Sequence, residues 1–364
     1  VGSGIPRIDF SDDANGALLL EPTATNIITY SEDFSNGGFW NKSSSTVATS
    51  TIVSPDGLQG SYKLVPNIGT GGNRSLSHSY LSLTGIHTHT CFAKKGEYNY
   101  LMLRLRNSPN AGVMFDLANG TLSVNAAGAT YVDSKIENIG NGWYKCSITL
   151  DPSLATTVGQ LYISMSVGIT GAETNSFDGD GTSGIYIWGS QFEQNSYATS
   201  YIKTVGTAQT RSADTANSAG NASLINSTEG VLYAEISALN EDQPVTVISI
   251  SNQGLSNRVF IVLSAGELKG GFVSSTDNTG KTTSGVVIEN FNKIACSYTS
   301  TTFKVFVNGL QIGTTSTIST ALVGLTELAF DRGDGVLDFV GKTKSVQVYT
   351  TALTDAELTT LTTI

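Results

Sequence analysis

Residues 184–214 read GIYIWGSQFEQNSYATSYIKTVGTAQTRSAD, and this stretch decides the fold of the first half of the chain. Ile185 and Ile187 alternate with Trp188, which is the period of a half-buried strand. A further strand-like run follows at residues 197–202. A much earlier stretch, LLLEPTATNIITYSEDFSN at residues 18–36, is the natural counterpart of the first. We predict that the two stretches form the first and last strands of one β-sandwich.

Together these two stretches resemble a module that recurs in bacteriophage tail and virion structural proteins, and the resemblance covers residues 5–215. The module's tail usually reads Ser-Tyr-Ile-Pro-Thr, whereas this chain has Lys203 in place of the proline. The module is similar to a carbohydrate-binding β-sandwich. The resemblance therefore implies a virion tail or surface appendage, an extracellular location, and other virion subunits as partners.

A second resemblance begins near Glu229. The segments EGVLYAEIS (229–237), KIACSYTSTTFKVFVNGLQIG (293–313) and GKTKSVQVYTTALTDAELTTL (341–361) resemble a laminin-G/concanavalin-like sandwich. Such domains are commonly lectin-like and usually non-catalytic, and many bind Ca²⁺. Within these segments, Asn308-Gly309 predicts a tight hairpin. Thr354 and Glu357 form a capping-box pattern, which predicts a short helix over 355–361.

The composition is typical of β-proteins. The chain has 364 residues, of which only 14% are charged, and glycine (39) far outnumbers proline (7). A span poor in large apolar residues, 203–228, separates two series of strand-like runs. We therefore predict an all-β protein with two antiparallel β-sandwich (jelly-roll) domains in tandem and one short C-terminal helix. The expected division is an N-terminal arm (1–17), a carbohydrate-binding-module-like sandwich (18–218) and a laminin-G/concanavalin-like sandwich (219–364).

The charge and the cysteines exclude several classes of partner. The net charge is −10, with no basic excess in either half, so we expect no nucleic-acid partner. No apolar run approaches about 18 residues, so we expect no membrane-spanning helix and no membrane partner. Three scattered cysteines do not form a disulfide framework and are expected to be buried. The chain opens with VGSG and no methionine, and we expect it to be a fragment of a longer protein.

No recognisable catalytic motif is present, so we predict that the chain is not an enzyme. Nucleophile elbows, zinc-protease helices and phosphate loops are all missing. His87, His89 and Cys91 would share one face of a strand, as Zn²⁺ ligands could. The same residues also fit an ordinary buried strand, and we favour that interpretation. A glycosidase pair of carboxylates stays open, because such pairs are spatial and not sequential.

Candidate sugar-binding residues come from two strands. In 98–106 the leucines at 101, 103 and 105 should face the core, and in 160–167 Leu161, Ile163, Met165 and Val167 should do the same. The opposite face would then combine aromatic and guanidinium groups that suit a glycan. The candidates on this face are Tyr98, Tyr100, Arg104, Arg106 and Tyr162. A solvated or subunit-packing face is the alternative.

The tryptophans divide into structural and candidate binding residues. Trp143 recurs in the module and is expected to be structural. Trp188 should lie on the face opposite the main core, and Trp40 follows a Gly-Gly turn as either an exposed platform or an edge plug. Trp188 and Trp40 are therefore candidates for stacking on a sugar ring.

Two aspartate-rich loops are candidate Ca²⁺ sites, and Ca²⁺ is the candidate cofactor. Asp178 and Asp180 lie in a glycine-rich loop, and Asp331, Asp334 and Asp338 form a similar cluster later in the chain. Carboxylates and backbone carbonyls suit this hard cation. Ordinary Asp-Gly turn chemistry is the alternative.

These observations favour a non-catalytic fragment of a virion or tail appendage that binds polysaccharide or glycan on a bacterial host surface. One alternative is a structural module that decorates a tail shaft. The other is the accessory binding region of a polysaccharide-degrading enzyme. A homo-oligomer is compatible with all three, although no coiled-coil heptads specify one.

Overall fold

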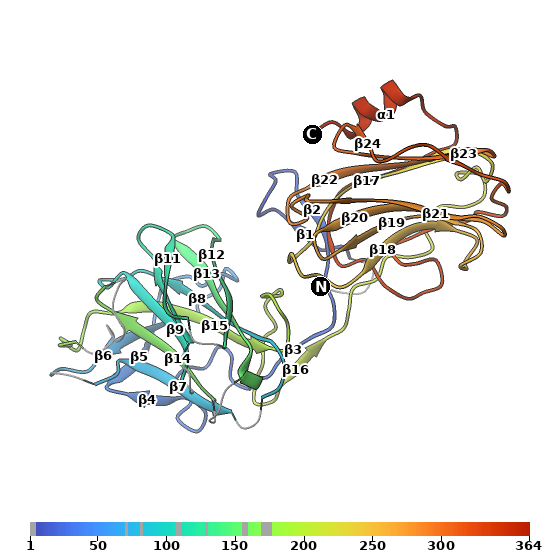
Figure 1. Ribbon diagram of the computed structural model, residues 1–364. Helices are drawn as coiled ribbons and strands as arrows, with labels where there is room; N and C mark the ends of the chain where they lie inside the picture. The colour runs from blue at the N-terminus through green and yellow to red at the C-terminus, as the bar shows by residue number, and fades with distance from the viewer. Residues whose placement is uncertain are drawn as a thin grey trace. The chain divides into compact units, whose positions relative to one another are not determined.

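The computed structural model describes residues 5–69, 72–80, 83–106, 111–127, 130–154, 159–168 and 177–364. The protein is nearly all-β, with several antiparallel sheets and a short C-terminal helix, as predicted. It divides into two compact units, visible in Figure 1. We call residues 23–212 the inserted unit, and residues 1–22 with 213–364 the split unit.

This division differs from the expected boundaries at residues 17/18 and 218/219. The N-terminal residues do not form a separate arm, because β1 (Ile8–Asp9) pairs with β2 (Ala17–Leu20), and β2 pairs with the late strand β27 (Gly341–Tyr349). Leu20 is buried in the core of the split unit. The pairing partner lies more than three hundred residues away, so local sequence carried no signal of it.

An ion cluster marks the point where the chain leaves and re-enters the split unit. The Arg7 guanidinium pairs with both Glu21 and Asp214. The Glu21 backbone N–H donates to the Asp214 carboxylate (2.8 Å), and the Asp214 N–H donates to the Glu21 carbonyl (2.9 Å). Residues 21 and 214 are therefore held side by side.

Two sheets build the split unit. The larger has the order β1-β2-β27-β17-β22-β23-β24, with β25 also paired to β23, and the smaller has the order β21-β20-β19-β18-β26. Figure 1 shows β17 and β22 in one layer and β19 and β20 in the other, and apolar residues such as Leu232 and Ile261 fill the space between them. The remaining strands are β17 (Gly230–Ser237), β18 (Thr246–Ser251), β19 (Arg258–Ser264), β20 (Glu267–Val273), β21 (Asn278–Ser284), β22 (Asn292–Tyr298), β23 (Thr302–Val307), β24 (Leu310–Gln311), β25 (Ser316–Thr317) and β26 (Glu327–Ala329).

The local signals near the C-terminus are confirmed. Asn308 and Gly309 both have positive φ (48° and 84°) in the turn between β23 and β24. Helix α1 (Asp355–Thr362) starts with the predicted capping box of Thr354 and Glu357. It lies outside β22 and β23 in Figure 1, with Leu358 buried against that sheet. Among the described residues, no helix is both long enough and apolar enough to cross a membrane.

Two six-stranded sheets face each other in the inserted unit, and a short ribbon joins β3 to β16. One sheet has the order β11-β10-β9-β14-β7-β4 and the other β12-β13-β8-β15-β6-β5. The strands are β3 (Ala24–Asn26), β4 (Asn41–Ser43), β5 (Ser45–Thr49), β6 (Tyr62–Pro66), β7 (Ser75–Tyr80), β8 (His87–Lys94), β9 (Tyr100–Arg106), β10 (Ala111–Asp116), β11 (Thr121–Ala127), β12 (Tyr131–Asn138), β13 (Trp143–Leu150), β14 (Gly159–Ser166), β15 (Ile185–Glu193) and β16 (Gln209–Arg211), with a 3₁₀ turn at Pro152–Leu154.

The two stretches that decided the fold do lie together. Asn26 is fully buried, and its side-chain amide donates to the carbonyls of Ser190 (3.1 Å) and Ile202 (2.9 Å). Its side-chain oxygen accepts from the N–H groups of Ile28 and Phe192, both at 3.1 Å. A single asparagine thus connects the first strand of the inserted unit to both runs at its end.

The cysteines are free and buried, as expected. The register places Cys91 of β8 directly opposite Cys146 of β13, a juxtaposition that their sequence spacing does not reveal. Burial raises the pKa of both thiols, so neither is an activated nucleophile.

Candidate functional site

The inner faces of β9 and β14 are as predicted, except that Val167 lies just beyond the end of β14 and is 53% exposed. Leu101, Leu103 and Leu105 pack in the core together with Leu161 and Ile163. The two strands are neighbours, with Tyr162 opposite Arg104. The predicted aromatic and guanidinium groups are therefore gathered on the other face of one sheet.

That other face is not the open platform that was expected. Arg104 and Tyr162 are each only 5% exposed, and the Arg104 guanidinium carbon lies 4.8 Å from the Tyr162 ring centroid. Arg106 is exposed and donates a long hydrogen bond (3.5 Å) to the Tyr162 hydroxyl. Tyr100 is half-buried and lies opposite Ser166 and Asp116. Arg104 and Tyr162 bind each other, and neither offers a surface for a sugar ring to stack on.

Tyr98 is on the wrong side of the sheet for the predicted face. Strand β9 begins only at Tyr100, so the alternation does not extend back to residue 98. The Tyr98 ring instead packs edge-on against Phe177 (5.2 Å between centroids) and against the main core.

The expectation that Trp188 or Trp40 is a stacking platform is wrong. Trp188 does lie on the face opposite the main core, but it is 4% exposed within a cluster containing Phe92 and Trp143. Trp40 is 1% exposed and donates from its indole nitrogen to the Tyr30 carbonyl (3.0 Å). Ile52 and Tyr201 pack against the Trp188 cluster, and such long-range contacts leave no trace in the local pattern.

Trp143 has the predicted structural role. Its indole N–H donates to the Val53 carbonyl (2.9 Å), and this bond ties the loop between β5 and β6 to the sheet. Within that loop the Ser54 hydroxyl donates to the Leu58 carbonyl (2.8 Å). The loop therefore has a defined shape, although Leu58 itself is exposed.

The His87-Thr88-His89-Thr90-Cys91 segment is a buried strand. The ring of His87 hydrogen-bonds the Gly85 carbonyl (3.0 Å), and the ring of His89 hydrogen-bonds the Ser190 hydroxyl (3.1 Å). Burial lowers the pKa of His89 to about 3. Both rings therefore make hydrogen bonds within the protein, which fits the interpretation of the segment as an ordinary buried strand.

Among the residues that the structure describes, neither aspartate loop brings together a set of Ca²⁺ ligands. Both carboxylate oxygens of Asp180 accept hydrogen bonds from Thr182 and Ser183 of its own turn, and these bonds hold its pKa well below the usual range, whereas Asp178 is exposed. Asp334 pairs with Arg332 (2.7 Å). Across the described part of the chain, no group of three or more His, Cys, Asp or Glu residues is placed to hold a metal ion.

Asp331 and Asp338 are the remaining carboxylates of the second candidate loop, and the charge of Asp331 acts on Asp338. Asp331 is buried and accepts from the Gly333 N–H. Burial, and then the charge of Asp331, raises the pKa of Asp338. Two carboxylates supply only part of the six to eight oxygens that Ca²⁺ takes, the rest of which backbone carbonyls or water would have to provide, so the calcium site stays a prediction. If a site forms there, calcium should raise the melting temperature of the split unit relative to EGTA, and Asp331→Asn should abolish the rise; calorimetry decides this.

A cleft of about 670 Å³ in the inserted unit combines the groups that a sugar site needs. We call it the tyrosine cleft. Its walls come from the segments around Glu32, Ser50, Gly60 and Thr204. Tyr30 and Tyr62 supply aromatic rings, and Gln59, Glu32, Asp33 and Lys203 supply hydrogen-bonding groups.

The walls of the tyrosine cleft are fixed by buried hydrogen bonds. The Thr204 hydroxyl donates to the Ile28 carbonyl (2.6 Å), and the Thr204 N–H donates to the Ser31 hydroxyl (2.9 Å). The Ser61 hydroxyl donates to the Ile52 carbonyl (2.7 Å) in the opposite wall. A cleft built on such contacts is largely pre-formed, which lowers the entropic cost of binding.

Sequence reasoning missed this cleft although the two decisive stretches contain several of its residues. Tyr30, Glu32 and Asp33 lie in the first decisive stretch, and Lys203 was noted only as a departure from the Ser-Tyr-Ile-Pro-Thr pattern. That departure was the available signal, because a lysine where a proline is usual adds a charge that packing does not require.

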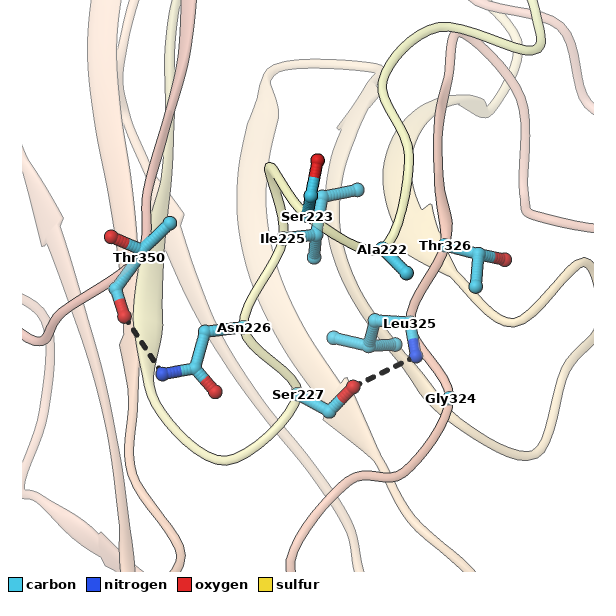
Figure 2. A pocket seen from close by; sticks show the side chains of 9 residues that line it. All are labelled: Ala222, Ser223, Ile225, Asn226, Ser227, Gly324, Leu325, Thr326 and Thr350. Atoms are coloured by element: carbon cyan, nitrogen blue, oxygen red, sulfur yellow. Dashed lines mark hydrogen bonds between the residues drawn. The ribbon is translucent and has the colours of Figure 1, made fainter.

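The split unit has a smaller pocket, of about 530 Å³, shown in Figure 2. The Asn226 side-chain amide donates to the Thr350 carbonyl (2.9 Å), and the Leu325 N–H donates to the Ser227 hydroxyl (2.9 Å). None of its nine lining residues is aromatic or charged. Its polar side chains hold the loops together, so the tyrosine cleft is the better candidate site.

Comparison with known families gives one match. The family model described as the concanavalin A-like lectin/glucanases superfamily matches residues 232–359. The match lies within the split unit and agrees with the predicted laminin-G/concanavalin-like region. No curated protein sequence matches the chain significantly.

Several solved structures show partial similarity. The Ruminococcus gnavus IT-sialidase CBM40 bound to α2,6-sialyllactose is 16% identical, covers 40% of this chain and 94% of its own, and has a TM-score of 0.32. Domain 4 of AbnA, a GH43 extracellular arabinanase from Geobacillus stearothermophilus in complex with arabinotriose, is 16% identical (46% and 80% covered, TM-score 0.30). Domains LG4-5 of the mouse laminin α1 chain are 8% identical (96% and 91% covered, TM-score 0.29).

Proposed function

We propose that this protein is a non-catalytic glycan-binding protein, and that the tyrosine cleft is its binding site. The observation that carries the proposal is the pairing of two tyrosine rings with hydrogen-bonding side chains in one pre-formed cleft. Aromatic faces cover the C–H surface of a sugar ring, while polar groups bind its hydroxyls. The lectin-type family match in the split unit supports the same class of function.

The chemistry of the cleft supports binding without catalysis. A glycosidase needs a carboxylic acid with a raised pKa as proton donor. In the cleft, the hydrogen bond from Ser35 is the main factor that lowers the pKa of Asp33, and Glu32 is paired with Lys203 (2.5 Å). The lowered pKa of Asp33 fits a hydrogen-bond acceptor better than a general acid.

For the biological setting we propose a virion or tail appendage that attaches to polysaccharide on a bacterial surface. The resemblance of residues 5–215 to the module of phage tail proteins supports this setting. A location outside the cell and contacts with other virion subunits belong to the same proposal.

The direct test is a glycan screen of the whole chain followed by substitution in the cleft. Tyr30→Ala should weaken binding of the best ligand roughly tenfold, because an aromatic anchor of the site is lost. Tyr186→Ala is the matched control, since Tyr186 lies on β15 and is not part of the cleft. Isothermal titration calorimetry measures both affinities.

Two results would count against the proposal. A blank screen, with known lectins positive alongside, would favour a structural module and make its oligomeric state the next measurement. Equal affinities for Tyr30→Ala and the unmodified chain would place the glycan elsewhere. Folding of both variants is checked by tryptophan fluorescence, because Trp40, Trp143 and Trp188 all lie in the inserted unit.

A further inference from the structure

The ionisable groups of the tyrosine cleft are not balanced. The Lys203 ammonium lies 2.5 Å from one carboxylate oxygen of Glu32, whose other oxygen accepts from the Tyr201 hydroxyl at 3.3 Å. Glu32 is largely covered, so this carboxylate compensates the positive charge of Lys203 within the cleft wall. The ion pair contributes no net charge toward a ligand.

Asp33 is different, because its hydrogen-bond donors in the cleft region are neutral. The Ser35 N–H (3.1 Å), the Ser35 hydroxyl (2.5 Å) and the Tyr62 hydroxyl (3.3 Å) all donate to the same oxygen, Oδ1. Neither Ser35 nor Tyr62 occupies the second oxygen, Oδ2. The Asn36 N–H is a further neutral donor that helps to lower the pKa of Asp33. The carboxylate is thus oriented and stabilised as an anion by neutral groups, next to the Tyr62 hydroxyl.

The charges of the lining residues determine which ligand charge the tyrosine cleft prefers. Counting Glu32, Asp33 and Lys203, the lining has one negative charge in excess. The faces of Tyr30 and Tyr62 carry the negative end of the ring quadrupole, which also attracts cations. The chain as a whole has a net charge of −10, which repels anionic polymers.

We propose that the tyrosine cleft recognises a glycan with free amino groups, such as a de-N-acetylated hexosamine polymer, with the sugar ammonium bound by Asp33. The inference rests on the proposed glycan-binding function and specifies its ligand class. Uronate, sialate and sulfate groups are disfavoured, because each would place a second anion beside Asp33.

Lys203 makes the preference of the tyrosine cleft for an amino sugar more selective. Without the lysine, Glu32 would be a second carboxylate with no cation beside it. The cleft would then attract any small cation, and its preference for a sugar ammonium at Asp33 would be weaker. With the lysine in place, Asp33 is the one carboxylate of the lining that is not paired with a cation among the residues described.

The test compares three oligosaccharides of equal length against the whole chain at pH 6: a β-1,4-linked glucosamine oligomer, its N-acetylated form, and a uronate oligomer. We expect the amine form to bind about tenfold more tightly than the N-acetylated form, because a cationic donor on the Asp33 carboxylate replaces a neutral amide donor. Raising the salt concentration should shrink this ratio. The uronate oligomer should bind the most weakly.

Asp33→Asn is the decisive variant, because it keeps the shape and removes the charge. We expect the amine-to-acetyl ratio to fall to about one. Glu241→Gln makes the same change of charge at an exposed position of the split unit and should leave the ratio unaltered. A thermal melt followed by circular dichroism checks that each variant is folded, because Glu241 lies in the split unit and all three tryptophans lie in the inserted unit.

Each outcome has a separate meaning. A ratio that survives in Asp33→Asn, or tight binding of the uronate oligomer, overturns the inference. Tight binding of neutral glycans alone, lost in Tyr30→Ala, also overturns it but leaves the proposed function standing. If no glycan of any charge binds, the proposed function fails and this inference fails with it.

Discussion

Replacing Asn26 with alanine should lower the free energy of unfolding of the inserted unit by about 4 kcal/mol. The substitution leaves two buried carbonyls and two buried N–H groups without their partner, and each such group costs about 1–3 kcal/mol, with some relief from local rearrangement. The four groups belong to Ile28, Ser190, Phe192 and Ile202. Because domains are stable by only about 5–15 kcal/mol, this is a large fraction of the total.

Tryptophan fluorescence in a urea titration measures this effect in the inserted unit alone, since all three tryptophans lie there. The matched control is Thr25→Ala in the same strand, where an exposed hydroxyl contact with Thr210 (2.8 Å) is lost. That control should change stability by less than about 1 kcal/mol. If Asn26→Ala were no more damaging than Thr25→Ala, the asparagine would not be the connection between the two ends of the unit.

Acidification should destabilise the inserted unit well before most carboxylates are protonated. His89 is fully buried, and this burial lowers its pKa to about 3 in the folded protein, whereas an unfolded histidine titrates near 6.5. The unfolded state therefore binds more protons between these values, and stability falls as the pH drops below about 6.5. His87 acts in the same direction, because desolvation lowers its pKa as well.

The expected loss from His89 is about 2–3 kcal/mol by pH 4.5, from 1.36 kcal/mol per pH unit. Fluorescence-monitored urea titrations at pH 7.5, 6.5, 5.5 and 4.5 give the slope. His89→Gln removes the titrating group and should flatten that slope by most of this amount, whatever its stability at pH 7.5. A slope that is the same in the variant would mean that His89 is protonated inside the folded unit.

The alternation of apolar residues predicted the inner faces correctly but not what covers the outer ones. Leu101, Leu103 and Leu105 face the core because the period of a strand is two, and that property is local. The burial of Trp188 depends on Ile52 and Tyr201, which come from distant parts of the chain. A strand pattern states which side a residue is on, and it does not state whether that side reaches solvent.

The candidate metal and sugar residues illustrate a second limit. Asp180 and Asp334 have the right chemistry for a cation, yet the first is bonded to its own turn and the second to Arg332. Tyr30, Tyr62 and Lys203 come together only because three separate segments meet at one cleft. Short-range signals such as the capping box at Thr354 succeeded because all the groups involved lie within four residues.

The sequence of the inserted unit interrupts that of the split unit, and this determines the order in which the two can fold on the ribosome. The inserted unit has its full sequence once residue 212 has left the exit tunnel, whereas β2 has to wait for its partner strand β27 (Gly341–Tyr349). Strand β2 can pair with the nearby β1, but its other edge stays unpaired until β27 has been made. A stalled or truncated nascent chain would display a folded inserted unit flanked by an orphaned, aggregation-prone apolar strand, Ala17–Leu20.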